Sequence, residues 1–187
     1  MASLTRDSMT PPETLQTARL ILRKPREDDA PLIFRTYWQD AEVTRYLMWR
    51  PHTHVQDAQT AIQRFVSGWT SETRFCWLIV TRDADELVGS IAARKDENGV
   101  NLGYLLARSH WGRGLMTEAV AAVVRWAFSD PSIFRVWAVC DVENRASARV
   151  LEKAGFLCEG VLKQWSLQPN VSAIPRDCYS YAQTRQS

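Results

Sequence analysis

The sequence predicts a single α/β domain of the mixed α+β kind, in which helices cover both faces of a mixed, mostly antiparallel sheet of about seven strands. Two observations predict this class. Strand-like and helix-like segments follow one another in the order strand, helix, helix, three strands, helix, strand, helix, two strands. The 187 residues contain no repeat and no internal linker, so we expect one domain with one core.

The first half of the chain is predicted to hold a strand, two helices and two further strands. Residues 18–23, in which Arg19 and Arg23 bracket a short apolar run, alternate enough to predict a strand. Apolar residues recur at helical spacing over residues 28–38 and again over residues 55–69. The two strands that follow are expected over residues 76–81 and 87–94.

The second half alternates strands with two helices. Asn98-Gly99 predicts a tight hairpin before a strand over residues 100–107. Asn144 is suited to cap the N-terminus of a helix, and Gly155 is suited to end that helix. The remaining predicted elements are a helix ending near Phe128 and strands over residues 135–140, 156–165 and 176–184.

Composition excludes several classes of protein. Residues 1–16 include Pro11-Pro12 and lack the apolar core of a signal peptide, so we expect a flexible arm ahead of a domain over residues 17–187. No later segment approaches the roughly 18 apolar residues of a membrane helix, and we expect a cytoplasmic protein without membrane contact. A net charge of +2 with scattered basic residues argues against nucleic-acid binding. The four cysteines form no Cys-x-x-Cys pair, so no metal site is expected.

Residues 109–119 form a loop with two glycines, Gly112 and Gly114, between a strand-like run and a long apolar helix. The N-terminus of a helix leaves several backbone N–H groups unpaired, and the helix dipole adds partial positive charge there. Glycine lacks the Cβ that would keep a phosphate away from the backbone. The loop is therefore suited to hold an anion, and we expect a pyrophosphate.

Two nucleotide classes do not fit this loop. Leu115-Met116 follow the second glycine where a nucleoside-triphosphate loop carries Lys-Ser or Lys-Thr. Thr117 stands where a dinucleotide fingerprint requires a third small residue, and the loop lies in mid-chain after predicted hairpins. The expected pyrophosphate therefore belongs to a ligand of another kind.

Residues 144–156 contain a second motif, which adds to the evidence from the glycine loop. Residues 144–156 read Asn-x-x-Ser-x-x-x-Leu-Glu-Lys-x-Gly-Phe, residues 103–106 read Gly-Tyr-x-Leu, and residues 111–119 read Trp-Gly-x-Gly-x-x-Thr-Glu-Ala. Together these motifs resemble the GNAT acetyltransferases, specifically the RimJ/RimL-like branch of ribosomal-protein N-acetyltransferases. The likeness extends from residues 18–23 to residues 176–179 and so covers all but the N-terminal arm.

The resemblance implies a GNAT-like fold and acetyl-CoA as the cofactor. It places the pyrophosphate on the backbone N–H groups of the glycine loop and the pantetheine arm beside the strand that precedes it. The matching Asn of the family touches the cofactor arm, although an Asn at this place also caps a helix in the absence of any ligand. The implied cofactor-binding residues are Leu105, Leu106, Gly112, Arg113, Gly114, Leu115, Met116, Thr117 and Asn144.

For catalysis, the resemblance points to Ser147, since a Ser at that place is proposed to assist the leaving thiol in this branch. Many other family members have a Tyr one turn further on, where this chain has Leu151. No base is identified. Several relatives carry a Glu where this chain has Asn101, while Asp141, Glu159 and a chain of water molecules remain open as alternatives.

In this fold the acceptor contacts the first two helices, their connection and the last hairpin. The implied acceptor-binding residues are Trp49, Arg50, His52 and Tyr179. We therefore expect an acetyl-CoA-dependent N-acetyltransferase that moves an acetyl group to a primary amine by direct attack in a ternary complex. A protein N-terminus is the first candidate acceptor. A small amine (an amino acid, polyamine or antibiotic) and a non-catalytic CoA-binding module stay open, as do monomer and homodimer.

Overall fold

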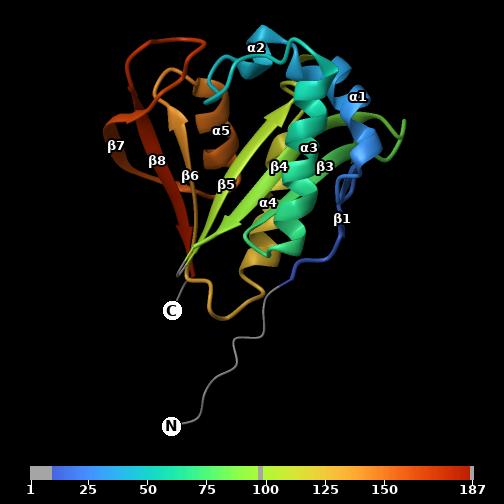
Figure 1. Cartoon of the computed structure of the whole chain (residues 1–187). Helices are drawn as coiled ribbons and strands as arrows, with labels where there is room; N and C mark the ends of the chain where they lie inside the picture. Colours follow the sequence, from blue (N-terminus) through green and yellow to red (C-terminus); the bar gives the residue numbers. More distant parts are fainter. Residues whose placement is uncertain (1–9, 97–98, 186–187) are drawn as a thin grey trace.

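The fold is built around one twisted sheet, seen in a computed structural model that describes residues 10–96 and 99–185 (Figure 1). Within these residues the strand order is β1-β2-β3-β4-β5-β6-β8-β7. Every neighbouring pair is antiparallel except β5 and β6, which are parallel. The strands are β1 (Thr14–Gln16), β2 (Leu20–Arg23), β3 (Arg74–Thr81), β4 (Leu87–Lys95), β5 (Gly99–Leu106), β6 (Arg135–Asp141), β7 (Leu157–Ser166) and β8 (Arg176–Thr184).

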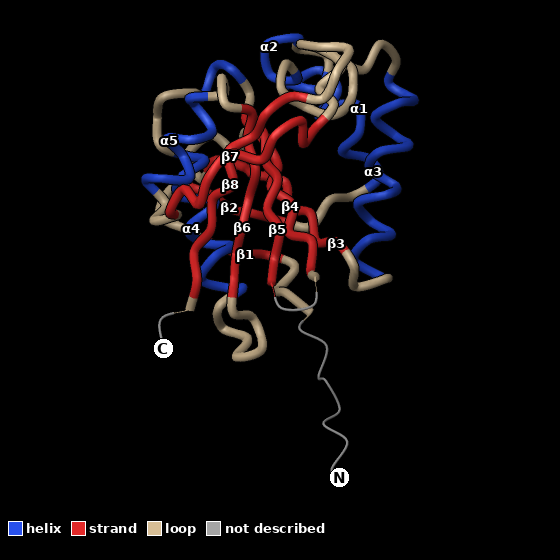
Figure 2. The backbone as a smooth tube through the Cα atoms, turned by 90° about the vertical axis from the view of Figure 1, so that its left-hand side faces the viewer, coloured by secondary structure: helices blue, strands red, loops and turns tan. Residues whose placement is uncertain are grey.

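Helices lie on both faces of the sheet, as predicted (Figure 2). The α-helices are α1 (Ala30–Ile33), α2 (Ala41–Thr44), α3 (Val55–Thr70), α4 (Leu115–Ala127) and α5 (Arg145–Lys153). Apolar side chains of α4 and α5 pack into the larger core cluster, on one face. Those of α1 and most of those of α3 pack into the second cluster, on the other face, while Trp69 near the end of α3 belongs to the larger cluster. Most side chains of α4, the long apolar helix that follows the glycine loop, are buried.

The parallel pair β5–β6 is short and then diverges. Pairing runs only from Gly99 to Asn101 on β5, opposite Arg135 to Trp137 on β6. The rest of β5 continues to Leu106 beside β4, while β6 leads away to α5 (Figure 1). Backbone groups on that side of β5 are therefore left without a strand partner among the described residues, between two layers of helices.

Three segments differ from the prediction. Thr14–Gln16 is a strand rather than part of a loose arm, because it pairs with the outer edge of β2, and residues 1–9 lie outside the described residues. The short α2 was not expected, since four residues are too few to show helical periodicity. The helix predicted over residues 28–38 is interrupted: it comprises η1 (Glu27–Asp29), α1 and a π-helical turn, η2 (Phe34–Trp38).

The remaining predicted elements are confirmed to within a few residues. Asn144 caps α5, and Gly155 follows it with a φ of 89°. The predicted Asn98-Gly99 turn falls partly outside the described residues, and Asp96 N–H donates to the Gly99 carbonyl across it, at 3.0 Å. In the described part of the chain, no helix combines the length and the apolar character needed to cross a bilayer.

Candidate functional site

The glycine loop is anchored to its surroundings by side chains outside the glycines. A short 3₁₀ turn, η3 (Arg108–His110), joins β5 to the loop. The indole of Trp111 donates to the carbonyl of Leu106 at 2.7 Å, which fixes the start of the loop to the end of β5. On the other side, Nη1 of Arg19 donates to the carbonyl of Arg113 at 2.9 Å. These two hydrogen bonds fix both ends of the loop.

The backbone of the loop presents its N–H groups outward. Gly112 and Gly114 have φ values of 74° and 73°, in the left-handed region that other L-residues adopt only with strain. Gly114 is the N-cap of α4 and offers no side chain to its first turn. None of the N–H groups of residues 112–117 donates to another described residue. These unpaired donors at the positive end of the α4 dipole fit an anion such as a diphosphate.

The space above the loop is open. A Cβ added to Gly112 would meet no atom within 4 Å, and residues 112–114 are exposed. The side chain of Arg113 forms no ion pair with a described residue. By contrast, the side chains of Leu115 and Met116 are buried in the larger core cluster, so these two residues can contribute only backbone donors.

The one acidic side chain in the first turn of α4 is turned away from the loop amides. Glu118 accepts hydrogen bonds from the Thr17 hydroxyl at 2.6 Å, from Arg19 N–H at 2.9 Å and from Arg19 Nε at 2.7 Å. Burial acts to raise the pKa of Glu118, but these hydrogen bonds outweigh it and the pKa is lowered. The carboxylate is therefore neutralised by Arg19 and does not compete for the unpaired N–H groups.

The N-terminus of α5 lies across the divergence between β5 and β6. The Asn144 side-chain oxygen accepts from Ser147 N–H at 3.1 Å. The hydroxyl of Ser147 lies 2.9 Å from the hydroxyl of Tyr104, which reaches it from β5. Burial raises the pKa of the Cys140 thiol on β6 to about 12, and the neighbouring Ser147 side chain partly offsets this effect. A polar cluster of Tyr104, Cys140 and Ser147 therefore lies between the two strands.

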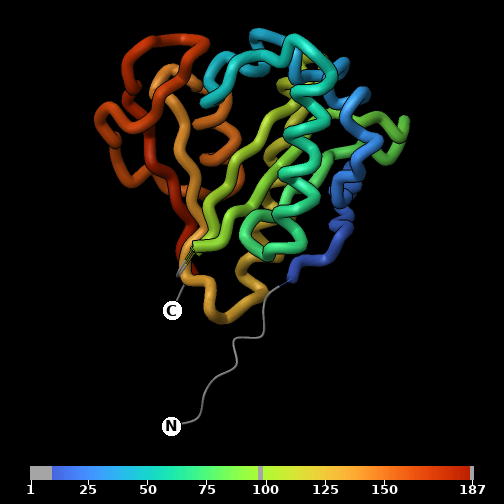
Figure 3. Tube along the Cα trace, in the orientation of Figure 1, coloured from blue at the N-terminus to red at the C-terminus, as the bar shows by residue number. Residues whose placement is uncertain are grey.

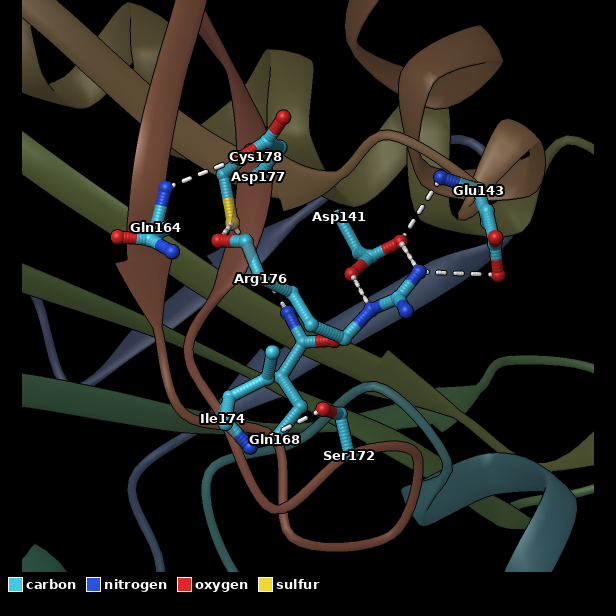
Figure 4. Close-up of polar contacts among 9 residues, drawn as sticks. All are labelled: Asp141, Glu143, Gln164, Gln168, Ser172, Ile174, Arg176, Asp177 and Cys178. Atoms are coloured by element: carbon cyan, nitrogen blue, oxygen red, sulfur yellow. Dashed lines mark hydrogen bonds and ion pairs between the residues drawn. The ribbon is translucent and has the colours of Figure 1, made fainter.

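The turn that carries Asn144 is fixed by an ion pair (Figure 4). Arg176, the first residue of β8, donates from Nε and Nη2 to the two carboxylate oxygens of Asp141, at 2.6 and 3.1 Å. The same guanidinium lies 3.0 Å from the carboxylate of Glu143. The Asp141 side chain is fully buried, and its carbonyl accepts from Asn144 N–H at 2.9 Å. Asp141 thus has a structural partner on each side.

Neither carboxylate that the sequence left open as a base is available. Asp141 is held by Arg176, and Glu159 forms a two-pronged ion pair with Arg135 on β6. Asn101, at the place where several relatives carry a Glu, lies with its amide 3.5 Å from the Trp137 carbonyl. All three side chains are therefore engaged with other groups of the protein.

The predicted acceptor residues fall into two groups. Trp49 and His52 lie together, with ring centroids 4.8 Å apart, and both contact Trp38. Burial lowers the pKa of His52, which favours the neutral imidazole. Trp49 and Leu105 pack against the same core cluster, on the α1–α3 face, so this aromatic group borders the end of β5.

Arg50 and Tyr179 line two different hollows. Arg50 lines a pocket of about 520 Å³ between α2 and the β7–β8 loop. Tyr179 lines a different hollow, of about 280 Å³, against α5. Tyr179 is therefore not in the wall of the pocket that contains Arg50, and its contact with the acceptor stays a prediction.

Some residues of the site were missed from the sequence. Tyr104 stands in the Gly-Tyr-x-Leu motif, but its contact with Ser147 requires knowing that β5 and α5 face each other. Arg19 contacts Glu118, which lies 99 positions away in the chain. Arg176 contacts Asp141, which lies 35 positions away. No local sequence pattern predicts such pairs.

The comparisons with known proteins agree with this geometry. The family model described as "Acetyltransferase (GNAT) domain" matches residues 19–157. The uncharacterized N-acetyltransferase YoaA of Bacillus subtilis is 35% identical over 92% of this chain and 98% of its own. The [ribosomal protein uS5]-alanine N-acetyltransferase of Escherichia coli is 28% identical over 86% of each chain. Among solved structures, RimL, a ribosomal L7/L12 alpha-N-protein acetyltransferase in complex with coenzyme A, has a TM-score of 0.82 at 22% identity, covering 92% of this chain and 98% of that one.

The expected fold and family are thereby confirmed. The family model and a relative that aligns over almost the whole of both chains agree with the divergent strands and the unpaired loop amides. The chain belongs to the GNAT acetyltransferase family and is an N-acetyltransferase.

Proposed function

We propose that this chain transfers the acetyl group of acetyl-CoA to a primary amine, and that the acceptor is the N-terminus of a protein. The assignment of acetyl-CoA rests on the unpaired backbone N–H groups of residues 112–117, which follow the part of β5 that does not pair with β6. The acceptor class is supported by relatives that are named for acetylating ribosomal proteins, among them the alanine N-acetyltransferase of Escherichia coli.

The loop amides hold the diphosphate of acetyl-CoA, and the exposed guanidinium of Arg113 adds positive charge beside it. The pantetheine arm lies along Leu105 and Leu106, where β5 has backbone groups without a strand partner. The side-chain oxygen of Asn144 is used in capping α5, which leaves its amide N–H groups to donate to the arm.

Acetyl-CoA supplies the activated thioester, which the amine attacks directly while both substrates are bound. The CoA sulfur leaves as a thiolate that accepts a hydrogen bond from the Ser147 hydroxyl, and the Tyr104 hydroxyl, 2.9 Å away, orients that group. A thiolate with a pKa of roughly 8.5 needs only modest help of this kind. The acceptor arrives from the opposite face, past Trp49 and His52, and loses its proton to water.

The cofactor assignment is tested by ligand-dependent thermal stability. Acetyl-CoA is expected to raise the melting temperature, whereas ATP and NAD are not. Stabilisation by ATP or NAD but not by acetyl-CoA would contradict both the enzyme and the CoA-binding module.

The acceptor is tested by release of free CoA thiol with a panel of peptides and small amines. Turnover of peptides blocked at every side-chain amine, with mass spectrometry locating the acetyl group on the N-terminus, is the expected result. Turnover of an amino acid, a polyamine or an antibiotic alone would transfer the activity to a small amine. Absence of turnover with every amine would favour a non-catalytic module.

A further inference from the structure

The pocket that contains Arg50 has a distinct charge. Its wall is made of residues from α2, the segment after it and the β7–β8 loop: Ala41, Glu42, Arg45, Arg50, Pro51, Pro169, Asn170 and Val171. Arg45 and Arg50 are exposed, and neither forms an ion pair within the described residues. Glu42 is the only acidic side chain in the wall, so the lining carries a net positive charge.

The two sides of the pocket are joined by one side chain. Asn170, in the β7–β8 loop, donates from Nδ2 to the carbonyl of Thr44 at 2.8 Å and to that of Trp49 at 2.7 Å. Figure 3 shows the segment after α2 and the β7–β8 loop at the same end of the molecule. Thr44 immediately precedes Arg45, and Trp49 immediately precedes Arg50. The two hydrogen bonds of Asn170 therefore fix the backbone next to both arginines.

The pocket lies at the end of the sheet where acetyl transfer is proposed. Arg108, two residues beyond β5, lies with its Nε 3.7 Å from the carboxylate of Asp40, the N-cap of α2. Val43 of α2 packs against the same cluster as Leu105 and Trp49. The positive pocket is therefore adjacent to the aromatic group that borders the end of β5.

We propose that this pocket binds a carboxylate of the acceptor, so that the preferred substrates carry an acidic group close to the reacting amine. The inference rests on the proposed function and narrows its substrate class. Two separate guanidinium groups on a fixed backbone suit a carboxylate, since each can donate a charge-assisted hydrogen bond. An acidic protein N-terminus and a small amino acid with a second carboxylate share this chemistry.

The test compares matched acceptors. Thiol release is measured with Ser-Glu-Glu-Ala and Ser-Gln-Gln-Ala peptides, amidated at the C-terminus, and with free aspartate and asparagine. Arg45→Gln and Arg50→Gln are each expected to reduce the ratio of kcat/KM for the acidic acceptor to kcat/KM for the neutral acceptor about fivefold. Added salt is expected to reduce the acidic preference of the unaltered chain and to have little effect in the double variant. Preference among peptides alone identifies a protein N-terminus, and preference for aspartate alone identifies a small acceptor.

Arg35→Gln is the control, because Arg35 is exposed on η2 and lies outside the pocket. If the arginine variants lowered kcat/KM equally for acidic and neutral acceptors, or if the unaltered chain did not prefer acidic acceptors, the pocket assignment would be wrong. The proposed acetyltransferase activity would still stand. Equilibrium binding of the two peptides to the CoA-loaded protein separates the two proposals. If no amine is turned over, the proposed function fails. The pocket assignment then stands if the acidic peptide binds more tightly than the neutral one and if Arg45→Gln and Arg50→Gln remove that difference.

Discussion

The site contains two helix N-termini, those of α4 and α5, which differ in whether a side chain caps their first turn. That of α5 is satisfied internally, because Asn144 accepts from Ser147 N–H and Asp141 fixes the preceding turn. That of α4 begins at Gly114, has no side-chain cap and leaves its first donors unpaired. Side-chain caps normally satisfy such groups.

The difference assigns a separate task to each helix. The first turn of α4 is kept open by glycines, and its only carboxylate is tied to Arg19, so it is prepared for an anion from outside. The first turn of α5 is rigid and positions side chains, namely the Ser147 hydroxyl and the remaining N–H groups of the Asn144 amide. We propose that the N-terminus of α4 binds the cofactor through its backbone and that the N-terminus of α5 acts through side chains.

The largest expected effect comes from closing the open terminus. Gly114→Val places a branched side chain at a φ of 73°, where L-residues are strained, and at the N-cap of α4, next to the unpaired donors in the chain. Because several hydrogen bonds to a charged group are lost together, affinity for CoA is expected to fall on the order of 1000-fold. Isothermal titration calorimetry measures the change. Gly160→Val is the matched control, since Gly160 also has a positive φ, of 146°, but lies on β7; if both variants lose CoA equally, strain rather than blocked donors is responsible.

The next effect tests the rigid terminus. Asp141→Asn removes the charge from a fully buried partner of Arg176 and is expected to reduce the free energy of unfolding by about 3 kcal/mol. Glu143→Gln changes the exposed partner of the same guanidinium and is expected to cost less than about 1 kcal/mol. Urea unfolding compares the two. Equal, small losses would mean that the pair does not fix the turn.

A smaller effect is expected from the Ser147 hydroxyl. Ser147→Ala is expected to lower kcat about tenfold with little change in affinity for CoA, because the hydroxyl acts on the leaving sulfur. Tyr104→Phe removes the partner at 2.9 Å and is expected to lower kcat by a smaller factor in the same direction. Steady-state kinetics and CoA titration give both quantities. An unchanged kcat in Ser147→Ala would remove the proposed role.

The smallest effect separates the two uses of Asn144. Asn144→Ser retains a good N-cap but loses the amide donors, so stability is expected to hold while KM for acetyl-CoA rises about threefold. Asn144→Ala loses the cap as well, at about 1 kcal/mol of stability. Thermal unfolding and initial rates distinguish the outcomes. If Asn144→Ser has the KM of the unaltered chain, Asn144 serves only as a cap.

The comparison also shows where sequence reasoning succeeds. Both helix termini were predictable, because a glycine pair and an Asn cap act on their own neighbours in the chain. The contacts that orient the side chains were not, since Tyr104 meets Ser147 only through the relative placement of β5 and α5. The same holds for Arg19 with Glu118. The strand Thr14–Gln16 was missed because its partner edge, not its own sequence, makes it a strand.

The central claim is that the open terminus of α4 binds a diphosphate through its backbone. A crystal structure of the CoA complex tests it most directly. Diphosphate oxygens are expected about 2.7–3.2 Å from backbone nitrogens within residues 112–117. A diphosphate bound elsewhere, with those nitrogens covered by a protein side chain, would contradict the account.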